Sequence, residues 1–105
     1  MPDFIFAYHG GTVPETEAEQ QASMAAWGAW FEEIGEHVKD PGNPVGKSST
    51  VSAKGVSPDG GANPLSGYTI VTVDTHEAAE EMAKGCPIMG EGGSIEVAEI
   101  VELEM

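Results

Sequence analysis

The first hydrophobic run of the chain, residues 4–8 (FIFAY), is short and aromatic and is followed by Gly10-Gly11. These features predict a β-strand that ends at the two glycines. Alternate residues of a strand point to opposite faces, and here both sets are largely apolar. One set is Phe4, Phe6 and Tyr8, and the other is Ile5, Ala7 and His9. We therefore expect both faces of this strand to be covered.

From about residue 15 to residue 38 the apolar residues recur at helical spacing and form one stripe, which predicts an amphipathic helix. The stripe consists of Met24, Trp27, Trp30, Phe31, Ile34 and Val38. Either Thr12 or Thr16 is a suitable N-cap for this helix. Pro41 and Gly42 follow the stripe and are expected to stop the helix.

The rest of the chain contains three further strands and one further helix, separated by loops. The predicted order is a strand at 48–56, a loop at 57–66, a strand at 67–73, a helix at 74–84, a loop at 87–93 and a strand at 94–103. Asp74, with Glu77 three residues later, has the spacing of a capping box at the start of the second helix. The inward side of that helix is expected to consist of Ala78, Ala79, Met82 and Ala83.

The predicted order β-α-β-β-α-β is the ferredoxin-like arrangement of the α+β class. In this fold a four-stranded antiparallel sheet carries both helices on one face. The first, third and last strands nevertheless have apolar residues on both sides, as with Val97 and Ala98 in the last strand. An exposed apolar sheet face is a liability. We therefore expect a second copy of the chain to pack against it and form a homodimer.

Length and charge narrow the class of protein further. The 105 residues suffice for one domain, and a chain with 40% hydrophobic and 21% charged residues is expected to be globular. A net charge of −14, from 18 acidic residues against 4 lysines, disfavours binding to nucleic acids and to anionic membranes. No apolar run approaches the roughly 18 residues of a membrane span. The single cysteine, Cys86, suits the cytoplasm.

Residues 41–50 (PGNPVGKSST) come close to a phosphate-binding loop, which requires four residues between its two glycines and a helix after it. Only three residues separate Gly42 from Gly46, and a strand is predicted to follow. The anionic character of the chain also opposes phosphate binding. We interpret the segment as a connection between the first helix and the next strand.

Several stretches of the chain resemble the YCII-related family, also called DGPF-type proteins, of the dimeric α+β barrel superfamily. They are YHGG at 8–11, AAWGAWF at 25–31, GNPVG at 42–46, DGGANPLSGYTIV at 59–71 and AKGCPIMGEGGSIEVAEI at 83–100. The resemblance covers nearly the whole chain and implies a single YCII-related domain at residues 1–105. It also implies a ferredoxin-like fold, a dimer formed through the sheets, and a cleft between the sheet and the helices or at the mouth of the barrel. Trp27 stands near the position where some relatives have the histidine of a His–Asp pair.

His9 is the strongest candidate for a catalytic residue. It ends the first strand beside two glycines, whose lack of side chains leaves room for a ligand. If the face that it shares with Ile5 and Ala7 lines the barrel, its imidazole is a suitable proton acceptor. The alternative is a histidine that only satisfies hydrogen bonds at the end of a strand. Tyr8, on the other face, is expected to pack under the helices beside Trp27 and Trp30.

Four further residues are candidate ligand contacts. Trp27 and Trp30 belong to the helical stripe and are core residues by default, although one of them is well placed to form the floor of a pocket. Asp59 and Asn63 lie in a long loop, where they are either turn formers or part of a lid. The three histidines and one cysteine have no metal-ligand spacing, so neither a metal nor another cofactor is predicted.

Two functions fit these features. The first is a small dimeric protein that binds a small molecule or acts as an accessory protein. The alternative is a cofactor-independent enzyme acting on a small molecule in the barrel cleft, with aromatic compounds among the candidate substrates and His9 as proton acceptor. The sequence itself does not favour a particular ligand.

Overall fold

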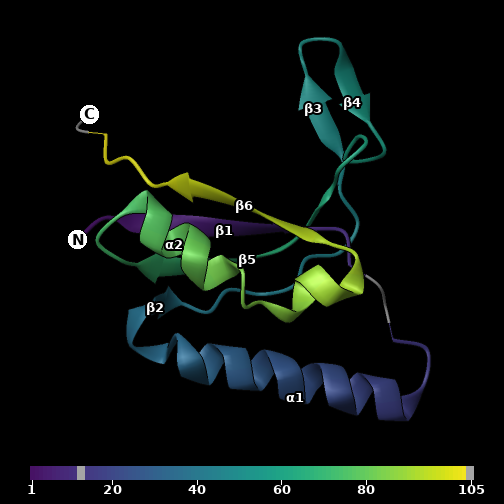
Figure 1. Ribbon diagram of the computed structural model, residues 1–105. Coiled ribbons are helices and arrows are strands. Elements are labelled where there is room, and N and C mark those ends of the chain that lie inside the picture. Colours follow the sequence, from purple (N-terminus) through teal and green to yellow (C-terminus); the bar gives the residue numbers. More distant parts are fainter. Residues whose placement is uncertain (12–13, 104–105) are drawn as a thin grey trace.

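The computed structural model describes residues 1–11 and 14–103 of the chain, and two helices and a four-stranded antiparallel sheet dominate it (Figure 1). The sheet strands are β1 (Asp3–His9), β2 (Val38–Asp40), β5 (Leu65–Thr72) and β6 (Ser94–Glu99), and the helices are α1 (Glu17–Glu33) and α2 (His76–Ala83). Two short 3₁₀ turns, η1 (Gly35–His37) and η2 (Pro87–Glu91), and a separate pair of strands, β3 (Thr50–Ser52) and β4 (Gly55–Ser57), complete the fold.

The strand order across the sheet is β2-β5-β1-β6, with every neighbouring pair antiparallel. The predicted α+β, ferredoxin-like βαββαβ arrangement is therefore confirmed. β1 lies in the middle because its alternate aromatic residues can be covered by helices on one face. Phe4, Phe6 and Tyr8 are buried, and they pack with residues from both helices.

The second sheet strand does not lie where the sequence predicted it. Residues 48–56 were expected to form this strand, but they contain a turn at 53–54, and β3 pairs only with β4 in a hairpin. Gly55 has φ 119°, which lets the chain reverse at this point. Val38, expected in the first helix, instead opens β2 and pairs with Val71. Figure 1 shows the hairpin standing away from the sheet.

The first helix is shorter than predicted. Thr16 is confirmed as its N-cap, because its Oγ1 accepts a hydrogen bond of 3.1 Å from the Glu19 N–H. Thr12, the other candidate, lies outside the described residues. The helix ends at Glu33 instead of near Val38, and the η1 turn follows it directly. Met24 is 75% exposed, so its predicted place in the apolar stripe is wrong.

The second helix starts one residue later than predicted. Thr75 is its N-cap instead of Asp74, and the Thr75 Oγ1 accepts a 3.0 Å hydrogen bond from the Ala78 N–H. Both residue types cap helices well, so sequence preference alone does not choose between adjacent candidates. Ala79 and Ala83 face the core as expected, whereas Ala78 is exposed.

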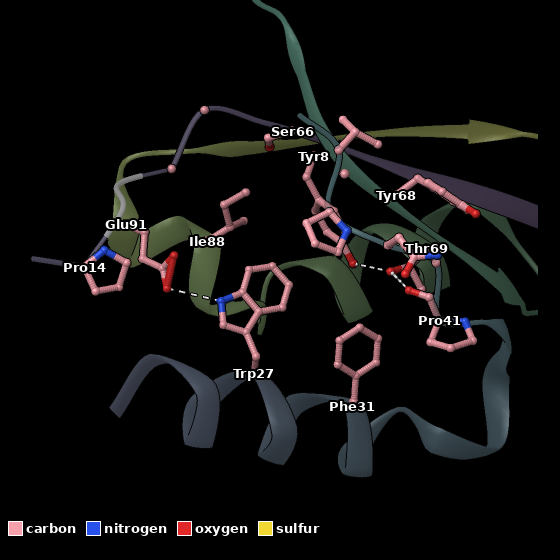
Figure 2. A pocket seen from close by; sticks show the side chains of 17 residues that line it. Tyr8, Pro14, Trp27, Phe31, Pro41, Ser66, Tyr68, Thr69, Ile88 and Glu91 are labelled. Atoms are coloured by element: carbon pink, nitrogen blue, oxygen red, sulfur yellow. Dashed lines mark hydrogen bonds between the residues drawn. The ribbon is translucent and has the colours of Figure 1, made fainter. Parts of the chain in front are cut away.

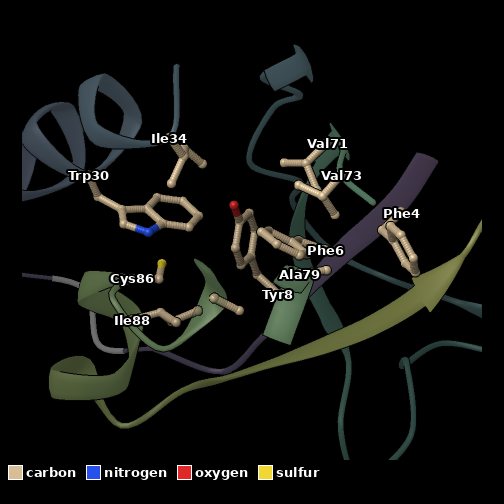
Figure 3. Packing of buried hydrophobic residues seen from close by; sticks show 11 residues of the cluster. Phe4, Phe6, Tyr8, Trp30, Ile34, Val71, Val73, Ala79, Cys86 and Ile88 are labelled. Atoms are coloured by element: carbon tan, nitrogen blue, oxygen red, sulfur yellow. The ribbon is translucent and has the colours of Figure 1, made fainter. Parts of the chain in front are cut away.

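The core lies between the sheet and the two helices (Figure 3). Trp30 and Ile34 enter it from α1, and the Trp30 Nε1–H donates a hydrogen bond of 3.1 Å to the Met82 carbonyl oxygen. Cys86 is buried beside them, and burial raises the pKa of its thiol to about 11. A buried thiol of this kind is unreactive at neutral pH.

Both helices pack against the face that carries Phe4, Phe6 and Tyr8, and no helix of residues 1–11 and 14–103 covers the other face of the sheet. Residues opposite each other in neighbouring strands share a face, and here Ile5 lies between Ile70 and Ala98 while Ala7 lies beside Tyr68. All five residues are half-buried. We call this group the open sheet face. Within residues 1–11 and 14–103, no helix is long and apolar enough to span a bilayer.

Candidate ligand-binding pocket

A cavity of about 580 Å³ lies between α1 and the sheet (Figure 2). Six parts of the chain form its wall: the end of β1 with Gly10 and Gly11, Pro14 before α1, one side of α1, the 41–45 segment after β2, the first half of β5, and η2. The residues that line it are mostly aromatic, apolar or glycine, and four are polar: Asn43, Ser66, Thr69 and Glu91. The larger aromatic and apolar ones are Tyr8, Pro14, Trp27, Phe31, Pro44, Val45, Tyr68 and Ile88.

The α1 helix contributes Trp27 and Phe31, which are four residues apart and therefore lie on the same side of the helix. Their ring centroids are 6.3 Å apart, and the Trp27 ring meets the Tyr8 ring edge-on at 5.3 Å. The expectation that Tyr8 packs under the helices beside the tryptophans is thus confirmed. Trp30, three residues after Trp27, points into the core beside Phe6 and does not line the cavity.

A chain of hydrogen bonds fixes the Tyr8 hydroxyl at the cavity wall. The Thr69 hydroxyl donates to the Pro41 carbonyl oxygen at 2.9 Å, and this bond uses the only proton of that hydroxyl. The 2.7 Å contact between Tyr8 Oη and Thr69 Oγ1 must therefore use the proton of Tyr8. Burial raises the pKa of Tyr8 well above its ordinary value, so the phenol keeps this proton. The Tyr8 oxygen can then only accept a hydrogen bond from another molecule.

Glu91 provides a second polar group in the wall. Its Oε1 accepts hydrogen bonds from the Ser23 hydroxyl at 2.9 Å and from the Trp27 indole N–H at 3.2 Å. Within residues 1–11 and 14–103, the structure assigns no hydrogen bond to Glu91 Oε2. No side-chain oxygen or nitrogen of these residues is both buried and without a partner, so Oε2 must be accessible. Glu91 is half-buried and its position is fixed from two sides.

The 41–45 segment forms the side of the cavity nearest β5. Its main chain is tied to that strand, because the Tyr68 N–H donates to the Asn43 carbonyl oxygen at 3.3 Å and the Val45 N–H donates to the Ser66 carbonyl oxygen at 3.0 Å. Gly42 has φ +72° and lies so close to Tyr68 that no Cβ fits there. The prediction that residues 41–50 join a helix to a strand is wrong at its start, since residues 41–49 lead from β2 to β3.

Of the four predicted ligand contacts, only Trp27 lines this cavity. Trp30 belongs to the core, as described above. Asp59 is exposed, and its Oδ1 accepts a hydrogen bond of 3.0 Å from the Gly61 N–H, which is the arrangement of a turn former. Asn63 contacts His9 through its main-chain oxygen. A ligand contact by Asp59 or Asn63 remains a prediction.

His9 lies outside the cavity, on the open sheet face. Its Nδ1 is 3.0 Å from the Asn63 carbonyl oxygen, and its Nε2 is 3.1 Å from Glu96 Oε1. Both ring nitrogens thus face oxygen acceptors, and the side chain is only 12% exposed. A role as proton acceptor stays a prediction. Among the residues that the structure describes, no group of three or more His, Cys, Asp and Glu is suited to hold a metal ion.

Sequence reasoning missed Tyr8 and Glu91 as pocket residues. Tyr8 was expected to be a packing residue only, and its hydroxyl chain depends on Thr69, which is 61 residues away in the sequence. Glu91 lies in the loop predicted at 87–93, and its donor Trp27 is 64 residues away. The one local signal for a functional Glu91 was its position between two glycines in a loop, since acidic residues elsewhere in the chain occur mainly on helices and on the last strand.

Comparison with known proteins gives a similarity of fold. No protein-family model and no curated protein matches the chain. The structure is similar to that of 5-chloro-2-hydroxyhydroquinone dehydrochlorinase (TftG) from Burkholderia phenoliruptrix, solved in complex with 2,5-dihydroxybenzoquinone. The TM-score is 0.51 at 17% sequence identity, and the match covers 100% of this chain and 94% of the other. The TM-score and the coverage show that the two proteins share the ferredoxin-like fold, and at 17% identity the similarity extends to the fold alone.

Proposed function

We propose that this chain is a small-molecule-binding protein of the YCII-related family, with one domain at residues 1–105. Its ligand occupies the cavity between α1 and the sheet. The observation that carries the proposal is the cavity of about 580 Å³ with aromatic walls and two fixed polar groups. Ligand sites typically measure about 300–1,000 Å³ and combine apolar walls with a few placed polar groups.

The composition of the wall favours a ligand with a flat, apolar body. Trp27, Phe31 and Tyr8 offer ring surfaces for stacking, and such contacts contribute about 0.5–1.5 kcal/mol each beyond area burial. TftG, which has a similar fold, was solved in complex with a ring compound, 2,5-dihydroxybenzoquinone. That protein supports the class of ligand only by analogy of fold.

Tryptophan fluorescence tests this proposal, because Trp27 lines the cavity and Trp30 does not. We expect 2-phenylethanol to change the emission of the wild type and of Trp30→Phe, which retains Trp27. The change should be much smaller in Trp27→Phe, where only the core tryptophan reports. Equal changes in the two variants, or no change in any of the proteins, would show that the cavity does not bind this class of molecule.

We further propose a homodimer formed through the open sheet face. Ile5, Ile70 and Ala98 are apolar, and no helix within residues 1–11 and 14–103 covers them. Val51 and Val56, paired in the β3–β4 hairpin, are 76% and 70% exposed and suit a contact with the second copy. Sedimentation tests the interface: wild type should be a dimer and Ile70→Glu a folded monomer. A monomeric wild type at micromolar concentration would overturn it.

The second candidate function is a cofactor-independent enzyme with His9 as proton acceptor. The observation that favours it is the contact between His9 Nε2 and Glu96 Oε1, because a carboxylate that accepts from one ring nitrogen orients the imidazole. Nδ1 is then the proton acceptor, and a ligand has to displace its contact with the Asn63 carbonyl oxygen. The experiment is chloride release from 5-chloro-2-hydroxyhydroquinone, the substrate in the name of TftG. Release by the wild type that is lost in His9→Gln supports the enzyme. Binding without release leaves the binding protein as the function.

A further inference from the structure

Asn43 and Ser66 line the cavity with groups that both donate and accept, whereas the two polar groups fixed by hydrogen bonds in its wall, Tyr8 and Glu91, offer acceptors and negative charge. Glu91 is the one charged residue among the 17 that line the cavity, and none of them is Lys, Arg or His. The Tyr8 oxygen can only accept, because its proton goes to Thr69. Glu91 Oε1 already accepts two hydrogen bonds, whereas Oε2 has no partner within the described residues and is accessible.

From this arrangement we propose that the cavity binds a cationic amine attached to an apolar or aromatic body, with Glu91 as the counter-charge. This inference rests on the proposed small-molecule function and specifies the class of its ligand. An ammonium group has three donors and no acceptor. It therefore matches an accessible carboxylate oxygen and a tyrosine oxygen, neither of which has a proton to give.

The position of Trp27 fits the same ligand. Its indole N–H holds Glu91 while its ring contacts the Tyr8 ring, so the carboxylate and the aromatic wall are joined through one side chain (Figure 2). A cation within about 6 Å of an aromatic face is attracted by the ring, most strongly by tryptophan. The body of the ligand then packs against Phe31 and Ile88, which line the same cavity.

The charge of the whole chain acts in the same direction. With a net charge of −14, the chain attracts cations and repels anions before contact. An anionic ligand would bring its charge to Glu91 with no lining cation to compensate it. Burying an unpaired charge is costly. Carboxylates and phosphates are therefore the ligands that this cavity disfavours most.

Three molecules of similar size and shape differ in charge, so comparing them tests the effect of charge on binding. At neutral pH 2-phenylethylamine is a cation, 2-phenylethanol is neutral and phenylacetate is an anion. Titration calorimetry of the wild type should give a dissociation constant at least about tenfold lower for the amine than for the alcohol, or about 1.4 kcal/mol. Phenylacetate should bind most weakly. In Glu91→Gln the remaining side-chain oxygen can still accept from Ser23 and Trp27, but the preference for the amine should fall to about two- to fivefold, which the attraction of the Trp27 ring for a cation supplies.

Glu80→Gln is the matched control, because Glu80 is exposed on α2, does not line the cavity, and its loss changes the net charge equally. This variant should keep the preference for the amine. Equal binding of amine and alcohol by the wild type, or a preference that is undiminished in Glu91→Gln, overturns the cationic ligand with Glu91 as its counter-charge while the cavity remains a binding site. If the wild type binds none of the three, both this inference and the proposed function are overturned.

Discussion

Replacing Gly42 by alanine tests whether the 41–45 segment is held against β5 as described. Gly42 has φ +72°, and this left-handed conformation costs a residue with a Cβ about 1–2 kcal/mol. An added Cβ would also overlap the Tyr68 carbonyl group, so the segment has to move. Movement breaks the two main-chain hydrogen bonds from Tyr68 to Asn43 and from Val45 to Ser66, each contributing about 1 kcal/mol.

The expected loss in the free energy of unfolding is therefore about 3–4 kcal/mol, measured by urea denaturation followed by circular dichroism. Gly46→Ala is the control, because no atom lies within 4 Å of a Cβ at that position and its φ is not in the left-handed range. Its stability should stay within about 0.5 kcal/mol of the wild type. If the two variants unfold at the same urea concentration, the close contact between Gly42 and Tyr68 does not exist.

Three further predictions address other parts of the molecule. Gly28→Ala, in the exposed middle of α1 with no atom within 4 Å of the new Cβ, should raise stability by about 0.5–1 kcal/mol in thermal unfolding. Tyr8→Phe should lower the free energy of unfolding by about 0.5–1.5 kcal/mol, because it removes the hydrogen bond to Thr69 and leaves the Thr69–Pro41 bond in place. An unchanged free energy in urea denaturation would contradict the bond between Tyr8 and Thr69. Burial raises the pKa of Cys86 from 9.0 to about 11 in the folded chain, so the unfolded chain releases this proton at a lower pH. The free energy of unfolding should therefore fall as pH rises from about 9 to 11, and Cys86→Ala should lack this contribution to the fall.

The local pattern of the sequence determined much of the fold. The alternation of Phe4, Phe6 and Tyr8 identified β1 and its buried face, since a strand exposes every second residue to the same side. Trp30 and Ile34, four residues apart, identified the buried side of α1, and Thr16 was one of the two predicted N-caps. The order of these elements then led to the ferredoxin-like arrangement, because antiparallel strands and short connections leave few topologies.

Only the tertiary structure decided where the second sheet strand lies. Val38 continues the helical spacing of α1, but it enters β2 because it pairs with Val71 and packs on the core from there. Residues 48–56 contain enough β-branched residues to predict one strand. They form parts of two strands, β3 and β4, because the chain reverses at Gly55. Both outcomes depend on which distant strand is available for pairing. Local propensity does not contain that information.

The cavity is likewise a product of long-range contacts. Glu91 reaches Trp27 across 64 residues and Tyr8 reaches Thr69 across 61, so neither polar group can be recognised from its sequence neighbours. The sequence by itself did show the aromatic residues of α1 and β1 and the strong negative charge of the chain. Their assembly into a pocket required the 41–45 segment to lie against β5, and Gly42 permits this because it has no Cβ.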